Sequence, residues 1–313
     1  MIWEEYLKKL ITELSKYLKN DIQYSDLSND RICQIAQREI ELFIEDFKKW
    51  PTEKLILKEQ EKISKKDQDM LKYFITKRKR AVPLAYIIGR QEFYGLSFKL
   101  DKNTLIPRPE TEELVKFVLN FLSKLQIFRN HPLVLIDVGT GSGCVVVSVI
   151  KNIPKGLSVH KVFATDTNKK AIKLAKINAN ANLGKDNKII FIKSSLLSFL
   201  GNKKLPRNAI LIVMANLPYL SEKEYTNLSR EVKHYEPKYA LMGGAKGHEN
   251  ICKMLDQLLN LNNQSEVFLE ISPTVYPAIK KYCASNKKIS HIKVKRDLNR
   301  KLRYVHISMK CEC

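Results

Sequence analysis

Residues 215–220, Ala-Asn-Leu-Pro-Tyr-Leu, follow the apolar run of residues 209–214. This pattern predicts a buried strand that ends close to Asn216, with Pro218 and Tyr219 directly after it. The stretch contains no acid, base or thiol, so it supplies neither a general base nor a nucleophile. What it supplies is a neutral amide and a flat aromatic ring.

These side chains suit methyl transfer to a planar nitrogen, such as a side-chain amide or an exocyclic base amine. The lone pair of such a nitrogen is delocalised, and its proton is too weakly acidic for a protein base to remove first. Catalysis must then hold the nitrogen in line with the methyl donor and stabilise the charge that develops on it. The side-chain oxygen of Asn216 and a backbone carbonyl close behind it are the expected acceptors.

Two neighbours support this interpretation. Pro218 keeps Leu217 out of helical geometry, which helps to aim the Leu217 carbonyl. Tyr219 offers a flat wall for a planar group. Asn216, Leu217, Pro218 and Tyr219 are therefore the candidate catalytic residues.

A glycine-rich loop follows an earlier predicted strand. Residues 137–143 read Asp-Val-Gly-Thr-Gly-Ser-Gly, in which Gly139, Gly141 and Gly143 permit a tight turn and close approach of a ligand to the backbone. The helix expected after the loop has free N–H groups at its start. The spacing lacks the last interval of the dinucleotide fingerprint and no Gly-Lys-Ser/Thr follows, so a simple strand-to-helix turn is the alternative.

Asp166 ends the next predicted strand. A carboxylate there can accept hydrogen bonds from both hydroxyls of a ribose, whereas the alternative is an exposed cap of the helix that begins near residue 168. Together, the loop and Asp166 favour a cofactor that contains a nucleoside. They do not choose between NAD and S-adenosylmethionine, and the methyl-transfer interpretation of residues 216–219 selects S-adenosylmethionine.

The elements that must position these residues alternate between strand and helix from residue 111 onward. Strands are expected at 133–139, 161–166, 188–193, 209–215 and 266–271, and helices at 111–122, from 144, at 169–183, 250–261 and 274–284. The residues after 290 predict two more strands around a turn. This order predicts an α/β fold: a doubly wound, mostly parallel Rossmann-like sheet with an antiparallel edge, whose ligands bind beyond the carboxyl ends of the strands.

The N-terminal part has a different pattern. Apolar residues at helical spacing predict a small helical bundle over residues 1–80, and residues 81–110 contain an alternating segment with a glycine that predicts a hairpin linker. Residues 111–313 then form the domain with the chemistry, and the bundle is left to recognise a protein substrate. The basic residues 77–80 are expected to form a solvated helix end, with contact to a partner as the alternative.

Composition limits the possible partners. The net charge of +22 fits a polyanionic partner such as RNA, DNA or a ribosome-associated factor, and equally a lysine-rich composition bias. The six cysteines are scattered, and no secretory signal or membrane-length apolar run is found, so a cytoplasmic protein with reduced thiols and no membrane contact is expected. The terminal Cys-Glu-Cys has no accompanying His or Cys cluster, and no metal site is expected.

Several segments together resemble a known family. Residues 105–112 (Leu-Ile-Pro-Arg-Pro-Glu-Thr-Glu), 137–143, 215–220, 236–244 and 270–272 look like the HemK/PrmC protein-glutamine methyltransferases. The resemblance covers roughly residues 80–310, and a helical N-terminal domain is usual in that family. It implies S-adenosylmethionine as the donor and, as the acceptor, the glutamine in the Gly-Gly-Gln loop of peptide-chain release factors.

The resemblance also implies roles for single residues. The loop of Gly139, Thr140, Gly141, Ser142 and Gly143 would hold the amino-acid end of the cofactor, and Asp166 its ribose. Ser195 and Leu196 would lie near the adenine, and Asn216 to Tyr219 would bind the glutamine amide, with Asn216 also beside the cofactor. This chain departs from the family in two places, because Leu217 replaces a proline and Ser195 replaces an acid.

Two other functions are kept as alternatives. A nucleic-acid amino-methyltransferase that acts on DNA adenine or rRNA would share the motif at residues 216–219 and the positive charge, but residues 105–112 argue against it. A cofactor-binding factor with weak catalysis is suggested by Leu217 and Ser195, whereas the intact Asn216, Pro218 and Tyr219 argue against that.

Overall fold

The computed structural model describes residues 1–125, 131–202 and 205–311 and separates into two compact units. Unit 1 consists of Met1–Arg90 and Asn227–Glu236, and unit 2 of Gln91–Thr226 and Pro237–Cys313. Cys313 of the terminal Cys-Glu-Cys lies outside the described residues. The other five cysteines are free thiols.

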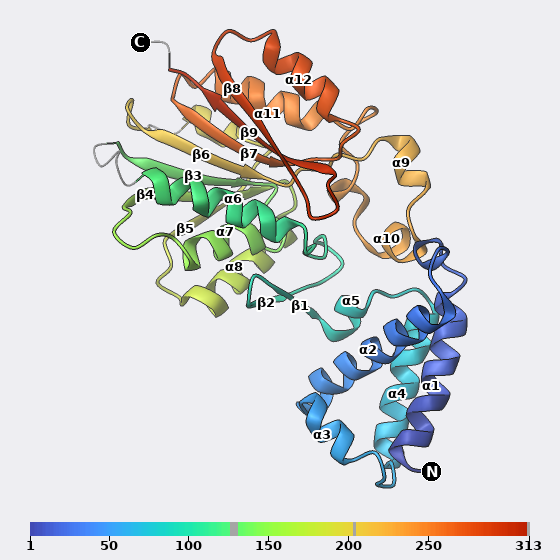
Figure 1. The fold of residues 1–313 in the computed structure, drawn as a ribbon. Helices are drawn as coiled ribbons and strands as arrows, with labels where there is room; N and C mark the ends of the chain where they lie inside the picture. Colours follow the sequence, from blue (N-terminus) through green and yellow to red (C-terminus); the bar gives the residue numbers. More distant parts are fainter. Residues whose placement is uncertain (126–130, 203–204, 312–313) are drawn as a thin grey trace. The chain divides into compact units, whose positions relative to one another are not determined.

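Unit 1 is helical (Figure 1). Its helices are α1 (Trp3–Leu18), α2 (Asn29–Lys48), α3 (Thr52–Leu57), α4 (Lys65–Lys79), α5 (Leu84–Ile88) and α10 (Arg230–Tyr235). Ser28 and Ser64 cap α2 and α4, because each hydroxyl accepts a hydrogen bond from a first-turn backbone N–H. Buried apolar residues at helical spacing form the core, where the rings of Phe43 and Phe74 stack 4.5 Å apart. The predicted helical pattern is confirmed.

The segment Asn227–Glu236 belongs to unit 1 through a buried ion-pair cluster. The Arg78 side chain is only 1% exposed, and its guanidinium donates to both carboxylate oxygens of Glu39 at 2.7 and 2.9 Å and to Glu231 at 2.6 Å. Its remaining terminal nitrogen donates to the carbonyl of Val82 at 2.6 Å. The expectation of a solvated helix end at residues 77–80 is therefore wrong for Arg78, because two acids distant in sequence supply its partners.

Unit 2 is built around a seven-stranded sheet of order β5-β4-β3-β6-β7-β9-β8. Its strands are β3 (Leu133–Val138), β4 (Val159–Asp166), β5 (Ile189–Lys193), β6 (Ile210–Ala215), β7 (Ser265–Glu270), β8 (Ile289–Arg296) and β9 (Leu302–Met309). The first five pair in parallel, and β9 runs antiparallel to both β7 and β8. The predicted doubly wound sheet with an antiparallel edge is confirmed. A separate hairpin of β1 (Arg90–Phe93) and β2 (Leu96–Lys99) matches the predicted linker hairpin.

Helices cover both faces of this sheet (Figure 1). On one face lie α6 (Thr111–Lys124), α7 (Cys144–Lys151) and α8 (Lys169–Leu183), and on the other lie α11 (Glu249–Leu259) and α12 (Tyr276–Ala284). A short helix, α9 (Glu222–Thr226), follows β6. None of the helices in the described residues is both long and apolar enough to cross a membrane.

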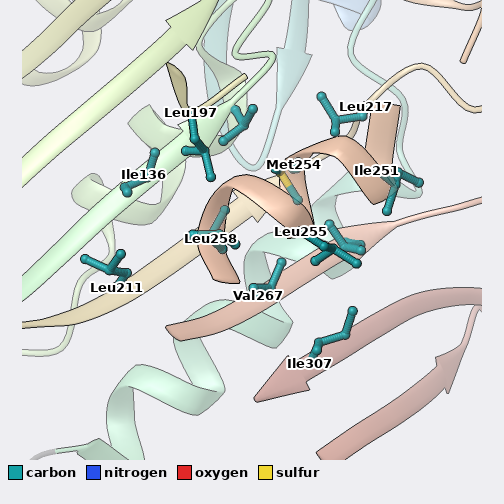
Figure 2. Packing of buried hydrophobic residues seen from close by; sticks show 14 of the residues in the cluster. Ile136, Leu197, Leu211, Leu217, Ile251, Met254, Leu255, Leu258, Val267 and Ile307 are labelled. Carbon is teal, nitrogen blue, oxygen red and sulfur yellow. The ribbon is translucent and has the colours of Figure 1, made fainter. Parts of the chain in front are cut away.

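Successive side chains of a strand point to opposite faces of the sheet, and this produces the two cores of unit 2. Val134 and Ile136 of β3 pack with Ile251 and Met254 of α11 in one cluster (Figure 2), whereas Leu135 belongs to the cluster on the α6 and α7 side. Every residue of β3, β6 and β7 is buried. Because β4, β3 and β6 are parallel neighbours, the loops after them leave from one edge of the sheet.

The Arg78 cluster generates a stability prediction. Replacing Arg78 with alanine leaves the carboxylates of Glu39 and Glu231 without their partner, so R78A is expected to lower the free energy of unfolding by about 3 kcal/mol. The measurement is urea unfolding followed by circular dichroism. K8A, which removes an exposed i,i+4 pair with Glu4, is the control and should leave the free energy of unfolding close to that of the wild type. Equal losses for R78A and K8A would show that the buried cluster does not stabilise unit 1.

Candidate active site

One pocket in unit 2 collects the loops that leave the sheet after β3, β4, β5 and β6. The segment before α6 and residues near α11 complete its wall. The lining residues are Asn103, Thr104, Leu105, Pro107, Arg108, Thr111, Asp137 to Ser142, Cys144, Val145, Asp166, Thr167, Ser194 to Leu196, Asn216 to Pro218, Tyr239, Ala240 and Asn250. Gly143 and Tyr219 are the two candidate site residues that are not part of this wall.

The glycine loop is held tightly on both sides. Gly139 has a φ of +74°, and a β-carbon there would lie 3.1 Å from Cδ2 of Leu217. Gly143 has a φ of +83° and precedes α7, and a β-carbon there would lie 3.2 Å from that of Ala175 in α8. Side chains at these positions would therefore be strained and crowded. Gly143 packs a helix against the loop, whereas Gly139 faces the pocket.

Asp137 fixes the loop from below. Its side chain is 2% exposed, and Oδ2 accepts from the Thr140 hydroxyl at 2.6 Å and from the Val146 N–H at 3.3 Å. Burial raises the pKa of this carboxyl to about 6. Asp137 was not among the residues nominated from sequence, although an acid at the end of a buried strand is a signal that could have identified it.

Asp166 contacts the same loop from the neighbouring strand. Its Oδ2 accepts from the Gly141 N–H at 3.1 Å, and its Oδ1 accepts from the Asn168 N–H at 2.8 Å. Burial raises the pKa of Asp166. The cap of α8 is Asn168, whose side chain accepts from the Lys170 N–H at 2.9 Å, so the alternative of Asp166 as a helix cap is wrong.

Ser195 and Leu196 follow β5 and both line the pocket. Ser195 is exposed, and Leu196 has a φ of +53°, a left-handed conformation that costs a leucine about 1 kcal/mol or more. The Thr165 hydroxyl donates to the Leu196 carbonyl at 3.3 Å, which helps to hold this turn.

Asn216 follows directly after β6. Its side-chain Nδ2 donates to the Thr111 hydroxyl at 3.1 Å, and Thr111 is the first residue of α6. The Leu217 side chain is 4% exposed and packs in the same core cluster as Ile251 of α11 (Figure 2). The replacement of a proline at this position therefore adds an apolar anchor beside the pocket.

Tyr219 packs its ring against this core instead of lining the pocket, and burial raises its pKa to about 12. The backbone around it is covered by the glycines at 243 and 247. A β-carbon at Gly243 would lie 2.8 Å from the Tyr219 Cα, and one at Gly247 would overlap the Tyr219 carbonyl. Hydrogen bonds between Leu220 and the segment 241–243 complete this contact.

Sequence reasoning also missed the side chains that close the pocket. Tyr239 donates to the Asn103 carbonyl at 2.6 Å and accepts from the Asn168 amide, so it joins three loops. Arg108 and Thr111 come from the 105–112 segment, whose motif was noticed without assigning a role to any of its residues. The signal was present in that motif, but only the fold shows that its residues meet Asn216.

The chain matches two known families over separate ranges. Residues 27–89 match the PrmC N-terminal domain, and residues 115–218 match the family described as ribosomal protein L11 methyltransferase (PrmA). Among solved structures, the catalytic domain of hMettl16 in complex with a MAT2A 3′UTR hairpin has a TM-score of 0.51 and 16% identity, and covers 70% of this chain and 77% of its own. That likeness shows the methyltransferase fold alone.

Curated relatives are more similar. A protein of Bacillus cereus named release factor glutamine methyltransferase is 34% identical over 258 residues, which are 82% of this chain and 86% of the relative. A protein of the same name from Rhodopirellula baltica is 33% identical over 225 residues, which are 72% of this chain and 73% of the relative. The resemblance inferred from the motifs is confirmed, and the chain belongs to the family of release factor glutamine methyltransferases.

Proposed function

We propose that this enzyme transfers a methyl group from S-adenosylmethionine to the side-chain amide nitrogen of the glutamine in the Gly-Gly-Gln loop of peptide-chain release factors. The observation that carries the proposal is the convergence of the glycine loop, Asp166 and Asn216 in one pocket of a chain from this family. Its substrate would be met in the cytoplasm. The names of the relatives do not favour the alternative of a nucleic-acid amino-methyltransferase.

The residues present fit the cofactor. An ionised carboxylate has about four acceptor sites, so Asp166, which accepts from the backbone N–H groups of Gly141, Thr167 and Asn168, keeps acceptor capacity for a ribose hydroxyl. The loop from Gly139 to Ser142 would hold the amino-acid end, and Ser195 and Leu196 would lie beside the adenine. When bound, S-adenosylmethionine supplies an electrophilic methyl group on a sulfonium.

Asn216 would position the target amide. With Nδ2 bonded to Thr111, its Oδ1 is the atom left to accept a hydrogen bond from the substrate NH₂ group. The backbone carbonyl that follows in the motif would accept the other hydrogen. The Tyr219 ring was expected to form a wall for the substrate. Because it packs against the core, it would instead support the backbone of the motif.

We propose that the helical bundle recognises the release factor outside its Gly-Gly-Gln loop. All residues that would hold the cofactor lie in unit 2, and unit 1 has none of them. The charged residues of a shallow groove on α1 are Lys8, Lys9, Glu13 and Lys16, together with Lys79 of α4, which pairs with Glu13. Such a groove would attract an acidic surface, in a way that depends on salt.

The cofactor assignment predicts the effect of changing Asp166. D166N should weaken S-adenosylmethionine binding by about 1–3 kcal/mol, because it removes one acceptor from the ribose site and places a second donor beside the Gly141 N–H. Isothermal titration calorimetry measures this. D186N, a change of an exposed acid after α8, is the matched control and should bind as the wild type does. Unchanged affinity in D166N, or tighter binding of NAD than of S-adenosylmethionine, would contradict the assignment.

The positioning role predicts the effect of changing Asn216. N216A should lower kcat by about 10²–10³, since it removes one preorganised acceptor. N216D should also lose substantial activity. It places a negative charge beside the sulfonium, and it removes the N–H group that donates a hydrogen bond to the Thr111 hydroxyl. Tritiated methyl transfer to a full-length release factor measures both. N187A, in the turn after α8, is the control, and a fully active N216A would show that the site is misplaced.

The basic groove predicts a change in KM alone. The triple variant K8E/K9E/K16E should raise KM for a full-length release factor about tenfold and leave kcat and cofactor binding unchanged, because the groove belongs to unit 1 and every pocket residue belongs to unit 2. Turnover of a short peptide containing Gly-Gly-Gln should not change. If the triple variant kept the KM of the wild type at low salt, the +22 charge would have no role in substrate binding at this groove.

A further inference from the structure

A buried acid lies one hydroxyl group away from Asn216. Glu270 is the last residue of β7 and is 2% exposed, as is Thr111. The Thr111 side chain hydrogen-bonds to the Glu270 carboxyl. In the described part of the chain, the other carboxyl oxygen, Oε2, has no hydrogen-bond partner. Glu270 begins the segment 270–272 that contributes to the family resemblance, but it is not a pocket-lining residue and no role has been given to it above.

The acid determines the direction of the hydrogen bonds in this chain of groups. An ionised carboxylate only accepts, so the single hydroxyl proton of Thr111 must point to Glu270. The Thr111 oxygen is then an acceptor, and it takes its hydrogen bond from Nδ2 of Asn216 at 3.1 Å. If the Asn216 amide were turned the other way, its Oδ1 would face the Thr111 oxygen, and both atoms would be acceptors. The ionised acid therefore leaves Oδ1 of Asn216 as the free end of the amide.

We propose that Glu270 and Thr111 are positioning residues for the reaction, which hold the Asn216 amide with its oxygen toward the substrate. The proposal rests on the proposed function, because an acceptor at this place is useful only if the target is an NH₂ group. Neither residue has to touch the substrate. The relay consists of Glu270, Thr111 and Asn216.

The surroundings of Glu270 make the relay sensitive to pH. Burial is the largest effect and raises the pKa of Glu270 to about 7, with Glu110 acting in the same direction and Thr111, Arg303 and Arg108 opposing it. The other titratable groups that interact with it are Tyr304 of β9, Tyr219 after β6 and Cys144 of α7.

Protonation of Glu270 removes the constraint. A protonated carboxyl carries its own donor, so Thr111 can receive a hydrogen bond from it and donate to either end of the Asn216 amide. The motif alone predicts no steep rise in rate through pH 6 to 8, because no base takes part. Glu270 changes that prediction without acting as a base: the relay is enforced above about pH 7 and released below it.

Four variants test the relay through the pH profile of kcat/KM at saturating S-adenosylmethionine. The wild type should rise through about pH 7, and E270Q should stay near the low-pH level of the wild type at every pH, about tenfold below its plateau. T111V should also be flat, and T111S should restore the rise. E266Q is the matched control, since Glu266 is a buried acid at the other end of β7 that bonds to His306 and Ser308, and it should keep the wild-type profile.

A second readout does not require turnover. The side-chain NH₂ resonance of Asn216, assigned by its loss in N216A, should shift with pH in the wild type with an apparent pKa of about 7. E270Q and T111V should abolish that shift, and thermal melting and calorimetry with S-adenosylmethionine would establish that they remain folded. E270Q should also be more stable than the wild type above pH 7, because burial raises the pKa of Glu270 to about 7, and the wild type therefore loses stability as the pH rises from the ordinary glutamate pKa up to that value.

The outcomes separate the two proposals. A wild type that does not methylate any release factor would overturn the proposed function, while the amide resonance would still test the relay. An Asn216 resonance that does not titrate, or an E270Q profile that rises as the wild-type profile does, would overturn the relay. Loss of activity in E266Q equal to that in E270Q would assign the effect to the stability of β7 and not to Asn216.

Discussion

The hydrogen bond from Asn216 to Thr111 decides which atom of a neutral amide faces the pocket. An asparagine has nearly the same shape in both orientations, so its neighbours must choose between them. The choice requires the start of α6 to lie beside the end of β6. Tyr304 of β9 helps to keep it there, because its hydroxyl donates to the Glu110 carbonyl at 2.6 Å. The antiparallel edge of the sheet thus contributes to the geometry of a residue that follows a strand two positions away, β6.

The same constraint explains the crowding around residues 217–220. Leu217 fills the space that a side chain at Gly139 would need, so the cofactor loop and the substrate motif are packed against each other. Gly243 and Gly247 let a second segment lie directly on the backbone of Pro218 and Tyr219. A turn that contributes backbone carbonyls to a reaction must not move, and here both of its sides are in contact with protein.

Sequence periodicity was sufficient to predict most of the fold. Buried strands such as β3 and β6 are continuous apolar runs, and α8 was predicted with its observed bounds because its apolar residues recur at helical spacing between Asn168 and Gly184. The short helices α9 and α10 were not predicted, because segments this short carry little periodicity. The membership of residues 227–236 in the helical unit was not predictable either, since it depends on the pairing of Arg78 with Glu231.

The site was only partly predictable, for a related reason. Residues that follow strands, such as Asp166 and Asn216, could be identified because parallel strands bring their carboxyl ends together. Tyr239, Thr111 and Glu270 become visible only when the fold brings distant segments into contact. Tyr219 was predicted to offer its ring to the substrate, and the structure places that ring against the core. Leu217 was expected to contribute only its backbone carbonyl, and its side chain packs in the same core.

The most direct test of the proposed methyl transfer is mass spectrometry of a release factor after incubation with the wild-type enzyme and S-adenosylmethionine. The proposed activity predicts a mass increase of one methyl group on the peptide that contains Gly-Gly-Gln, with fragmentation placing it on the glutamine side chain. A release factor in which this glutamine is replaced should remain unmodified. Methylation of RNA or DNA in place of that peptide, or of another residue in the release factor, would contradict it.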